Sequence, residues 1–324
     1  MKTPRRSVLL LAAAALLPLS AHAQDRWPSK PIRWIAPYAA GGFADIRARK
    51  LAVDLAKNLG QPVYVENRAG AGGVVGTDAV AKAPPDGYTI GMGNLAALSV
   101  NVSLMKKLPY DPQKDLQPVV LIERSPLILT AGPGLKANTV QELIAYARAH
   151  PGELGFGSSG VGGAHHLSGE MLKLRTGIDI VHIPYKGGAP AAADVMAGHL
   201  PMMFEMGYAA MPSVKGGKIR ALAVTSTKRL ALLPEVPTMA ESGLPGFESF
   251  NWQGVVAPAG TPRAIVDRLN REFNAILALP DQRDAILATA SEPAGGTPEQ
   301  FRDLIASETV KWAEVVKAAK IQPE

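Results

Sequence analysis

Short apolar runs alternate with longer amphipathic stretches along the chain from Pro31 onward. The first run, 32–37, predicts a strand, and the residues that follow its glycine turn repeat at helical spacing. One face of that helix is apolar, with Gly60 placed to end it: Ala48, Leu51, Ala52, Leu55 and Leu59. The alternation of the two patterns predicts α/β architecture with mostly parallel sheets.

Further elements follow the same logic. Strands are expected at 63–66 and 88–92, and a helix near 76–83 before the turn at 84–87. Three more helix starts carry explicit signals, Thr139 with Glu142, Thr261-Pro262, and Thr297-Pro298 with Gln300. The last helix has a stripe that predicts core packing: Phe301, Leu304, Ile305, Trp312, Val315 and Val316.

The first 23 residues have the pattern of a secretory signal peptide. Cationic residues precede the apolar run 7–19, and Ala21-His22-Ala23 supplies a small-residue cleavage site. The alternative, an N-terminal membrane anchor, is disfavoured because the apolar run is too short to span a bilayer. We therefore expect a periplasmic protein whose mature chain begins at Gln24.

The mature length predicts two lobes, since about 300 residues is the upper limit for one hydrophobic core. No flexible linker divides the chain, so the lobes should be joined by crossing strands, for which 124–127 and 250–254 are the candidates. Lobe 1 would then be discontinuous, residues 24–124 and 252–324, and lobe 2 would be residues 125–251. A ligand cleft is expected between them.

Charge and cysteine content exclude several classes of protein. The chain has 34 Lys and Arg against 28 Asp and Glu, and loss of the signal peptide leaves 31 against 28, a formal charge of +3. Cationic runs with interleaved aromatic residues are missing, which argues against a nucleic-acid partner. The sequence has no cysteine, which excludes disulfides, thiol catalysis and thiolate metal sites.

Two glycine-rich strand-to-helix turns, 37–45 and 155–166, are the candidate binding elements, one in each predicted lobe. Such a turn exposes backbone N–H groups at the positive end of a helix, and glycine lets an anion approach them closely. The geometry can hold a carboxylate without Arg or Lys. The competing interpretation is that the glycines only permit tight turns. Asp45, in the first turn of its helix, is expected either to tie down loop N–H groups beside the ligand or to be a simple cap.

Other chemistries fit the sequence less well. Gly155-x-Gly157-x-x-Gly160 matches a dinucleotide fingerprint, but Asp179 precedes the next apolar run instead of ending it. Ser158 or Ser159 with His166 could form a hydrolase pair, although the glycine spacing of a nucleophile elbow is absent. His166 and Glu170 could share a helix face as metal ligands, but no third ligand has recognisable spacing. His150, His182 and His199 are expected in surface or packing roles.

The chain resembles the Bug family, the TctC-like extracytoplasmic binding proteins of tripartite tricarboxylate transporters, over essentially its whole mature length. These segments carry the resemblance: 37–42 with Asp45, 65–73, 85–89, 109–112, 157–160 with His166-Leu167, 184–188 and 257–262. It implies a type II periplasmic-binding-protein fold that closes on a carboxylate held by the two turns. When the family's site residues are transferred position by position, the resemblance implies a ligand-binding site with these members: Tyr38, Gly41, Gly42, Asp45, Asn94, Ser158, Ser159, His166 and Glu205. We add Phe43 from the first turn.

Departures from the family pattern suggest a particular ligand. Phe43 stands where the family generally has Gly, Ala44 where a small hydroxyl residue is common, and Val161-Gly162-Gly163 where more polar residues are frequent. Glu205 matches a position that is usually Asp. The less polar pocket favours a small organic carboxylate or dicarboxylate with an aromatic or aliphatic body. We expect a monomeric binding protein, not an enzyme, with no cofactor and no metal, which delivers its ligand to transporter membrane subunits or to a sensor kinase.

Overall fold

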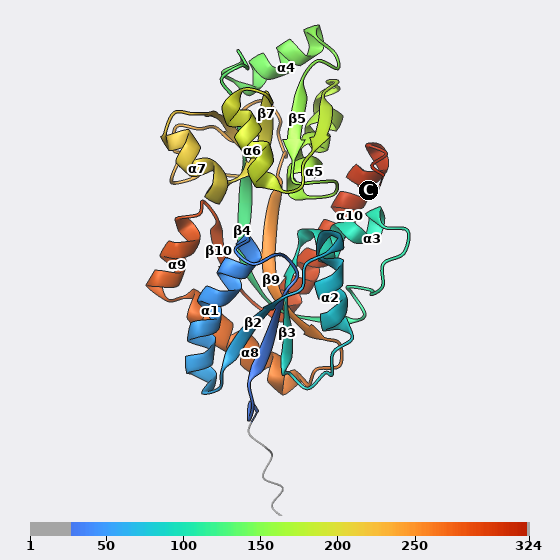
Figure 1. The fold of residues 1–324 in the computed structure, drawn as a ribbon, viewed down its shortest axis with the longest axis vertical. Helices are drawn as coiled ribbons and strands as arrows, with labels where there is room; N and C mark the ends of the chain where they lie inside the picture. The colour runs from blue at the N-terminus through green and yellow to red at the C-terminus, as the bar shows by residue number, and fades with distance from the viewer. Residues whose placement is uncertain (1–26, 323–324) are drawn as a thin grey trace, which may run out of the picture.

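Two stacked groups of elements form the molecule, and two long strands run between them (Figure 1). The structure, a computed structural model, describes residues 27–322, so the predicted signal peptide lies outside the described residues. The lower half holds β1–β3, β9, β10, α1–α3 and α8–α10, and the upper half holds β5–β8 and α4–α7. The strands are β1 Ile32–Ala36, β2 Val63–Asn67, β3 Thr89–Asn94, β4 Leu116–Ala131, β5 Gly155–Ser158, β6 Val181–Pro184, β7 Met202–Met206, β8 Arg220–Val224, β9 Phe250–Pro258 and β10 Glu292–Gly295.

The helices lie on both faces of the strands. They are α1 Phe43–Leu59, α2 Val74–Ala81, α3 Asn101–Leu104, α4 Val140–Ala149, α5 Ala164–Thr176, α6 Gly188–Ala197, α7 Gly207–Lys215, α8 Arg263–Leu277, α9 Pro280–Leu287 and α10 Pro298–Ala318, with short helical turns at Ala71–Gly73 and Ala96–Val100. None of the described helices is long and apolar enough to cross a membrane.

The strands form one mixed sheet in the order β2-β1-β3-β9-β4-β7-β5-β6. Pairing is parallel among β1, β2 and β3 and among β5, β6 and β7, as predicted. The long strands add antiparallel pairs with β3, β7, β8 and β10, so the whole sheet is mixed and not mostly parallel. The predicted crossings, 124–127 and 250–254, lie inside β4 and β9, while the residue bounds of the two lobes stay a prediction.

Local sequence signals explain most helix boundaries. The predicted apolar face of α1 is buried, and Gly60 ends the helix in the left-handed conformation. Thr297 and Gln300 form a full capping box at α10. At α4 the Thr139 side chain accepts from the Glu142 amide, but Glu142 accepts from Asn138 and not from Thr139. α8 begins after Pro262, which has no side-chain group that could cap the helix, and the Thr261 hydroxyl donates to the Pro258 carbonyl.

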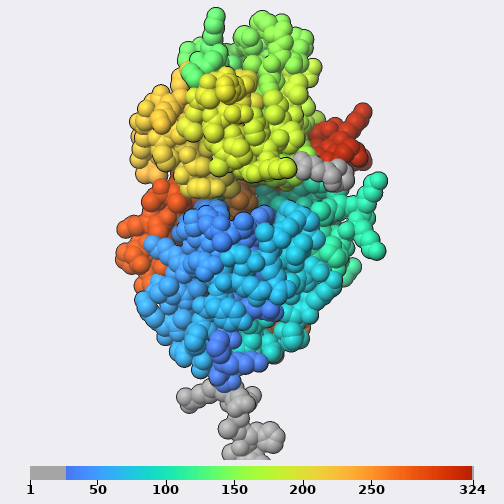
Figure 2. Space-filling model, viewed as in Figure 1, coloured from blue at the N-terminus to red at the C-terminus, as the bar shows by residue number. Residues whose placement is uncertain are grey.

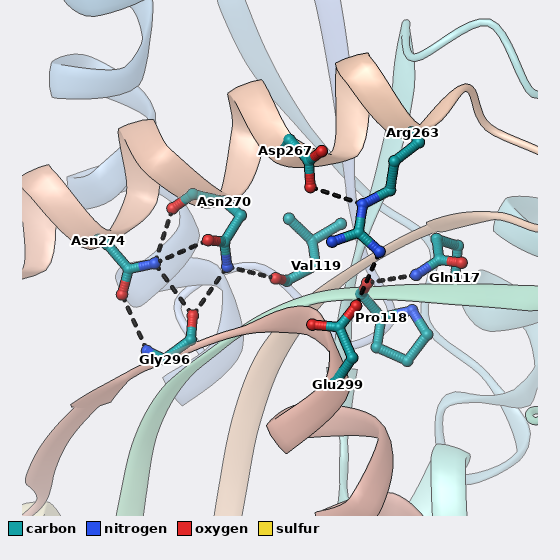
Figure 3. Close-up of polar contacts among 9 residues, drawn as sticks. All are labelled: Gln117, Pro118, Val119, Arg263, Asp267, Asn270, Asn274, Gly296 and Glu299. Carbon is teal, nitrogen blue, oxygen red and sulfur yellow. Dashed lines mark hydrogen bonds and ion pairs between the residues drawn. The ribbon is translucent and has the colours of Figure 1, made fainter.

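Two asparagines of α8 bind the segment between β10 and α10, and one of them also binds β4 (Figure 3). Asn270 Nδ2 donates to the Val119 carbonyl of β4 and to the Gly296 carbonyl, both at 2.8 Å. Asn274 accepts from the Gly296 amide at 2.9 Å and donates to its carbonyl at 3.0 Å. This network fixes the segment that leads from β10 into α10.

The hydrophobic core is arranged differently on the two sides of the sheet. On the side of α2, α5 and α10, one continuous buried cluster extends through both halves and includes Ile35, Phe156 and Trp312. On the side of α1 and α8, a separate cluster belongs to the lower half. Figure 2 shows the two halves meeting along a seam below the yellow and green atoms. On the α7 side a third, smaller cluster includes Ala290 of the lower half. The larger buried contact between the halves therefore lies on the α5 and α10 side.

Candidate ligand-binding site

The first glycine turn lies at the upper end of β1, where α1 begins and faces the upper half (Figure 1). Gly41 has a positive φ of 76°, and its amide donates to Asp45 Oδ2 at 2.8 Å. Gly42, the N-cap, donates to the Ala39 carbonyl at 3.2 Å. The next three amides, at 43–45, have no acceptor among the described residues, as expected for the first turn of a helix. Three N–H groups are thus free for an anion.

Asp45 organises this turn. Of the two roles expected from the sequence, the bond to the Gly41 amide fits the one in which Asp45 ties down loop N–H groups. Asp45 is 3% exposed and also accepts from Arg49 Nε at 2.8 Å. Arg49 in turn donates to the Asn67 side chain, and Asn67 donates to the Tyr38 carbonyl. Burial alone would raise the pKa of Asp45, but the Gly41 amide, Asn67 and Arg49 outweigh it and lower the pKa. Asp45 is therefore ionised and holds the loop in place.

Asp45→Ala should destabilise the protein by about 1 kcal/mol and weaken ligand binding by less than a blocked turn does, because it removes the bond to the Gly41 amide and not the free amides. Urea unfolding and calorimetric titration of the variant measure the two effects. Asp54→Ala is a control on the same helix, since Asp54 bonds Lys57 and Gln282 away from the turn. Wild-type stability in Asp45→Ala would contradict the structural role.

The second turn lies between β5 and α5, at the lower edge of the upper half. Ser158 Oγ is 2.6 Å from His182 Nε2, and Ser159 Oγ is 2.9 Å from His165 Nδ1. The Gly162 amide donates to His166 Nδ1 at 3.1 Å, which fixes the neutral tautomer of His166 with its proton on Nε2. The first three amides of α5, at 164–166, also lack acceptors among the described residues.

All three histidines of this region are neutral at pH 7. Burial lowers the pKa of His165 to about 4, and it lowers the pKa of His182 to about 4 with help from Lys173. Burial, then His182 and Lys173, lower the pKa of His166 to about 3. A carboxylate at this turn would meet N–H dipoles and not a formal positive charge.

The other predicted site residues lie on strand ends. Asn94 ends β3, is buried, and accepts from the Ala97 amide at 3.0 Å. Glu205 lies on β7 and is 3% exposed, and its Oε2 has no hydrogen-bond partner among residues 27–322. Burial raises the pKa of Glu205 to about 7. Tyr38 donates from its hydroxyl to the Gly72 carbonyl at 3.2 Å, so its ring joins the first turn to the 67–73 loop.

The structure places both turns at the seam between the halves. Gly162 of the second turn lies against Leu104 of α3, since a Cβ added there would be 2.4 Å from Leu104 Cδ2. The Phe43 ring, at the start of α1, stacks on Tyr208 of α7. No hydrogen bond joins the predicted residues of the two turns among residues 27–322, and a hollow of about 650 Å³ lies elsewhere, between α5 and α10. The binding role of the predicted residues stays a prediction.

The sequence analysis did not place two residues, His182 and Tyr208, near the predicted site. His182 was expected in a surface or packing role, but it hydrogen-bonds Ser158 and stacks on His166 with ring centroids 3.7 Å apart. Tyr208 carried a usable signal, because Gly207-Tyr208 directly follows the apolar run of β7 and is a third strand-to-helix turn. His182 had no such signal, since only the fold brings β6 beside β5.

The structure also bears on the alternative chemistries. Neither Ser158 nor Ser159 bonds His166, so that hydrolase pair is not assembled. His166 Nε2 is 3.8 Å from Glu170 Oε1, and the described residues contain no group of three or more side chains able to hold a metal ion.

Comparisons with known proteins identify similar molecules. The family model described as "Tripartite tricarboxylate transporter family receptor" matches residues 47–321. Protein BugT of Bordetella pertussis is 42% identical over 311 residues, 96% of this chain and 94% of BugT. The structure of R. palustris Rpa4515 with adipate is similar, with a TM-score of 0.84 and 37% identity over 92% of this chain and all of that one. MatC from Rhodopseudomonas palustris with bound malate has a TM-score of 0.80 and 32% identity over 90% of this chain and all of MatC.

Proposed function

The chain belongs to the tripartite tricarboxylate transporter receptor family, and from this premise we propose that it captures a small organic carboxylate between its two halves. The observation that carries the proposal is the set of free amides at the two helix starts, three from α1 and three from α5. Helix N-termini attract anions through unsatisfied N–H groups and the helix dipole. The two starts lie at the same seam.

The energies of these groups are sufficient for binding. A hydrogen bond to a charged group contributes about 1.5 to 3 kcal/mol, and a helix terminus about 0.3 to 2 kcal/mol more. Several such bonds reach the roughly 8 kcal/mol of a micromolar complex. Adipate in Rpa4515 and malate in MatC are both dicarboxylates, which supports the same ligand class for this chain.

The ligand we propose has a largely apolar body. Phe43 and Ala44 stand at the start of α1, and neither has a hydrogen-bonding side chain. The Phe43 ring stacks on the Tyr208 ring, which adds a second aromatic group at this place. A chain without hydroxyl or amino groups, such as adipate, suits this environment better than citrate or an amino acid does, because unmatched polar groups are costly to desolvate.

We propose binding without catalysis. Each serine of the second turn has a histidine partner, but no described carboxylate hydrogen-bonds either His165 or His182 as an orienting group. A nucleophile with an oriented base is therefore not assembled. An assay with activated esters tests this statement directly.

The proposed partners are membrane subunits of a tripartite transporter, and the proposed location is the periplasm. Family membership and the signal-like N-terminus support both. A sensor kinase that receives the closed, liganded protein would use the same site. The identity of the neighbouring genes would distinguish a transporter partner from a sensor-kinase partner.

A thermal-shift screen of the mature chain tests the ligand class. Adipate and other unsubstituted aliphatic or aromatic carboxylates should raise the melting temperature, because ligands that bind only the folded state stabilise it. Malate, citrate and aspartate are the polar comparison. The apolar-body proposal fails if only hydroxylated or amino-bearing acids raise the melting temperature, and the carboxylate proposal fails if none does.

A further inference from the structure

One aromatic pair joins the two halves directly. The rings of Phe43 and Tyr208 are almost parallel, with an interplanar angle of 4° and centroids 5.0 Å apart. The other aromatic pairs among residues 27–322 lie within one half. Phe43 is the first residue of α1 and Tyr208 the second residue of α7, so each ring is attached to a helix start.

The pair lies on the side of the molecule where the halves share the least core. The large continuous cluster joins them on the α5 and α10 side, whereas α1 and α7 lie on the other side (Figure 1). There the lower half adds only Ala290 to a small buried cluster with Ala210 and Met211 of α7. Separation of the halves on the α1 and α7 side would leave the large cluster intact, but it would part Phe43 from Tyr208 as well as Ala290 from α7. Tyr208 is 45% exposed, so the ring pair lies at the rim and not in the core.

We propose that Tyr208 is a positioning residue of the binding site, whose ring holds Phe43, and with it the free amides of α1, against the upper half when the halves close. A stacked aromatic pair present only in the closed state favours that state by about 2- to 12-fold. The apparent affinity for a ligand that binds the closed state changes by a similar factor.

The absence of cysteine allows a ligand-free test. Val53→Cys on α1 and Val181→Cys on β6 give two exposed label sites, 57% and 47% exposed, one in each half. Spin labels on the full mature chain then report the distance between the halves by double electron–electron resonance. Phe43→Ala and Tyr208→Ala should each lower the closed-to-open ratio by about 2- to 12-fold, and the double variant should be no lower than either single variant.

Tyr208→Phe is the matched control, because it keeps the ring and should give the wild-type distribution. Wild-type distances in Tyr208→Ala would overturn the proposal, as would a double variant whose effect is the product of the two single effects. Equal melting temperatures confirm that the variants fold.

A second readout rests on the proposed function. Stopped-flow dissociation of adipate should be about 2- to 12-fold faster from Tyr208→Ala than from wild type, with Tyr208→Phe unchanged. An unchanged dissociation rate would contradict the positioning role. If adipate does not bind the wild-type chain, the choice of ligand fails, while the distance measurement still decides the role of Tyr208.

Discussion

Gly42→Val should raise the Kd for the bound carboxylate by at least about 100-fold while the protein remains folded. The valine side chain would stand at the N-cap of α1, where an anion must approach the amides at 43–45. Loss of two hydrogen bonds to a charged group costs about 3 to 6 kcal/mol, which corresponds to more than 100-fold in Kd. Calorimetric titration with the tightest ligand from the thermal-shift screen measures the change.

The structure explains why Gly42 is the better site for this test than Gly41. Gly41 has a φ of 76°, so any side chain there would strain the backbone, whereas Gly42 has a φ of −77°. A Cβ at Gly42 would be 3.1 Å from the Ala39 carbonyl oxygen, which requires only a small adjustment. Gly216→Val is the matched control, with a φ of −78° and the same 3.1 Å contact, to Pro212, at the end of α7. Normal binding by Gly42→Val would exclude the first turn as the anion site.

Glu205→Gln should raise the free energy of unfolding by about 3 kcal/mol at pH 8 and by much less at pH 5. Burial raises the pKa of Glu205 from 4.5 to about 7, so between these values the folded state holds a proton that the unfolded state releases. Stability from this group is therefore present below pH 4.5 and is lost as the pH rises through 7. Glutamine keeps the shape without the charge.

Urea unfolding at the two pH values measures this effect, with Glu153→Gln on an exposed turn as the control. The same carboxyl should make ligand binding pH-dependent if Glu205 lines the site, because its ionised form adds a negative charge beside a carboxylate. We expect affinity to fall as the pH rises above 7 in the wild type and to change little in Glu205→Gln. A pH-independent stability difference between wild type and Glu205→Gln would contradict the raised pKa.

The sequence predicted those features that depend on residues close together in the chain. The two glycine turns, the helix face from Ala48 to Leu59 and the capping box at Thr297 are all local patterns, and the structure contains each of them. Even the bond from Gly41 to Asp45 follows from a four-residue spacing. Parallel pairing within each half also followed from the alternation of strands and helices.

Features that depend on distant segments could not be predicted. β4 pairs with β7, β8, β9 and β10, and nothing in the run 116–131 specifies these partners or their direction. The bond between His182 and Ser158 spans 24 residues, and the Phe43 and Tyr208 rings are 165 residues apart in the sequence. His182 was missed for this reason, whereas the strand-to-helix turn at Gly207-Tyr208 was a local signal that could have placed Tyr208 near the site, although not its contact with Phe43.

We propose that main-chain amides at the starts of α1 and α5 together hold one carboxylate-bearing ligand. A crystal structure of the mature chain with the carboxylate that raises its melting temperature most tests this claim directly. We expect carboxylate oxygens within hydrogen-bonding distance of amides from both 43–45 and 164–166, directly or through one water. A ligand bound away from either helix start would contradict it.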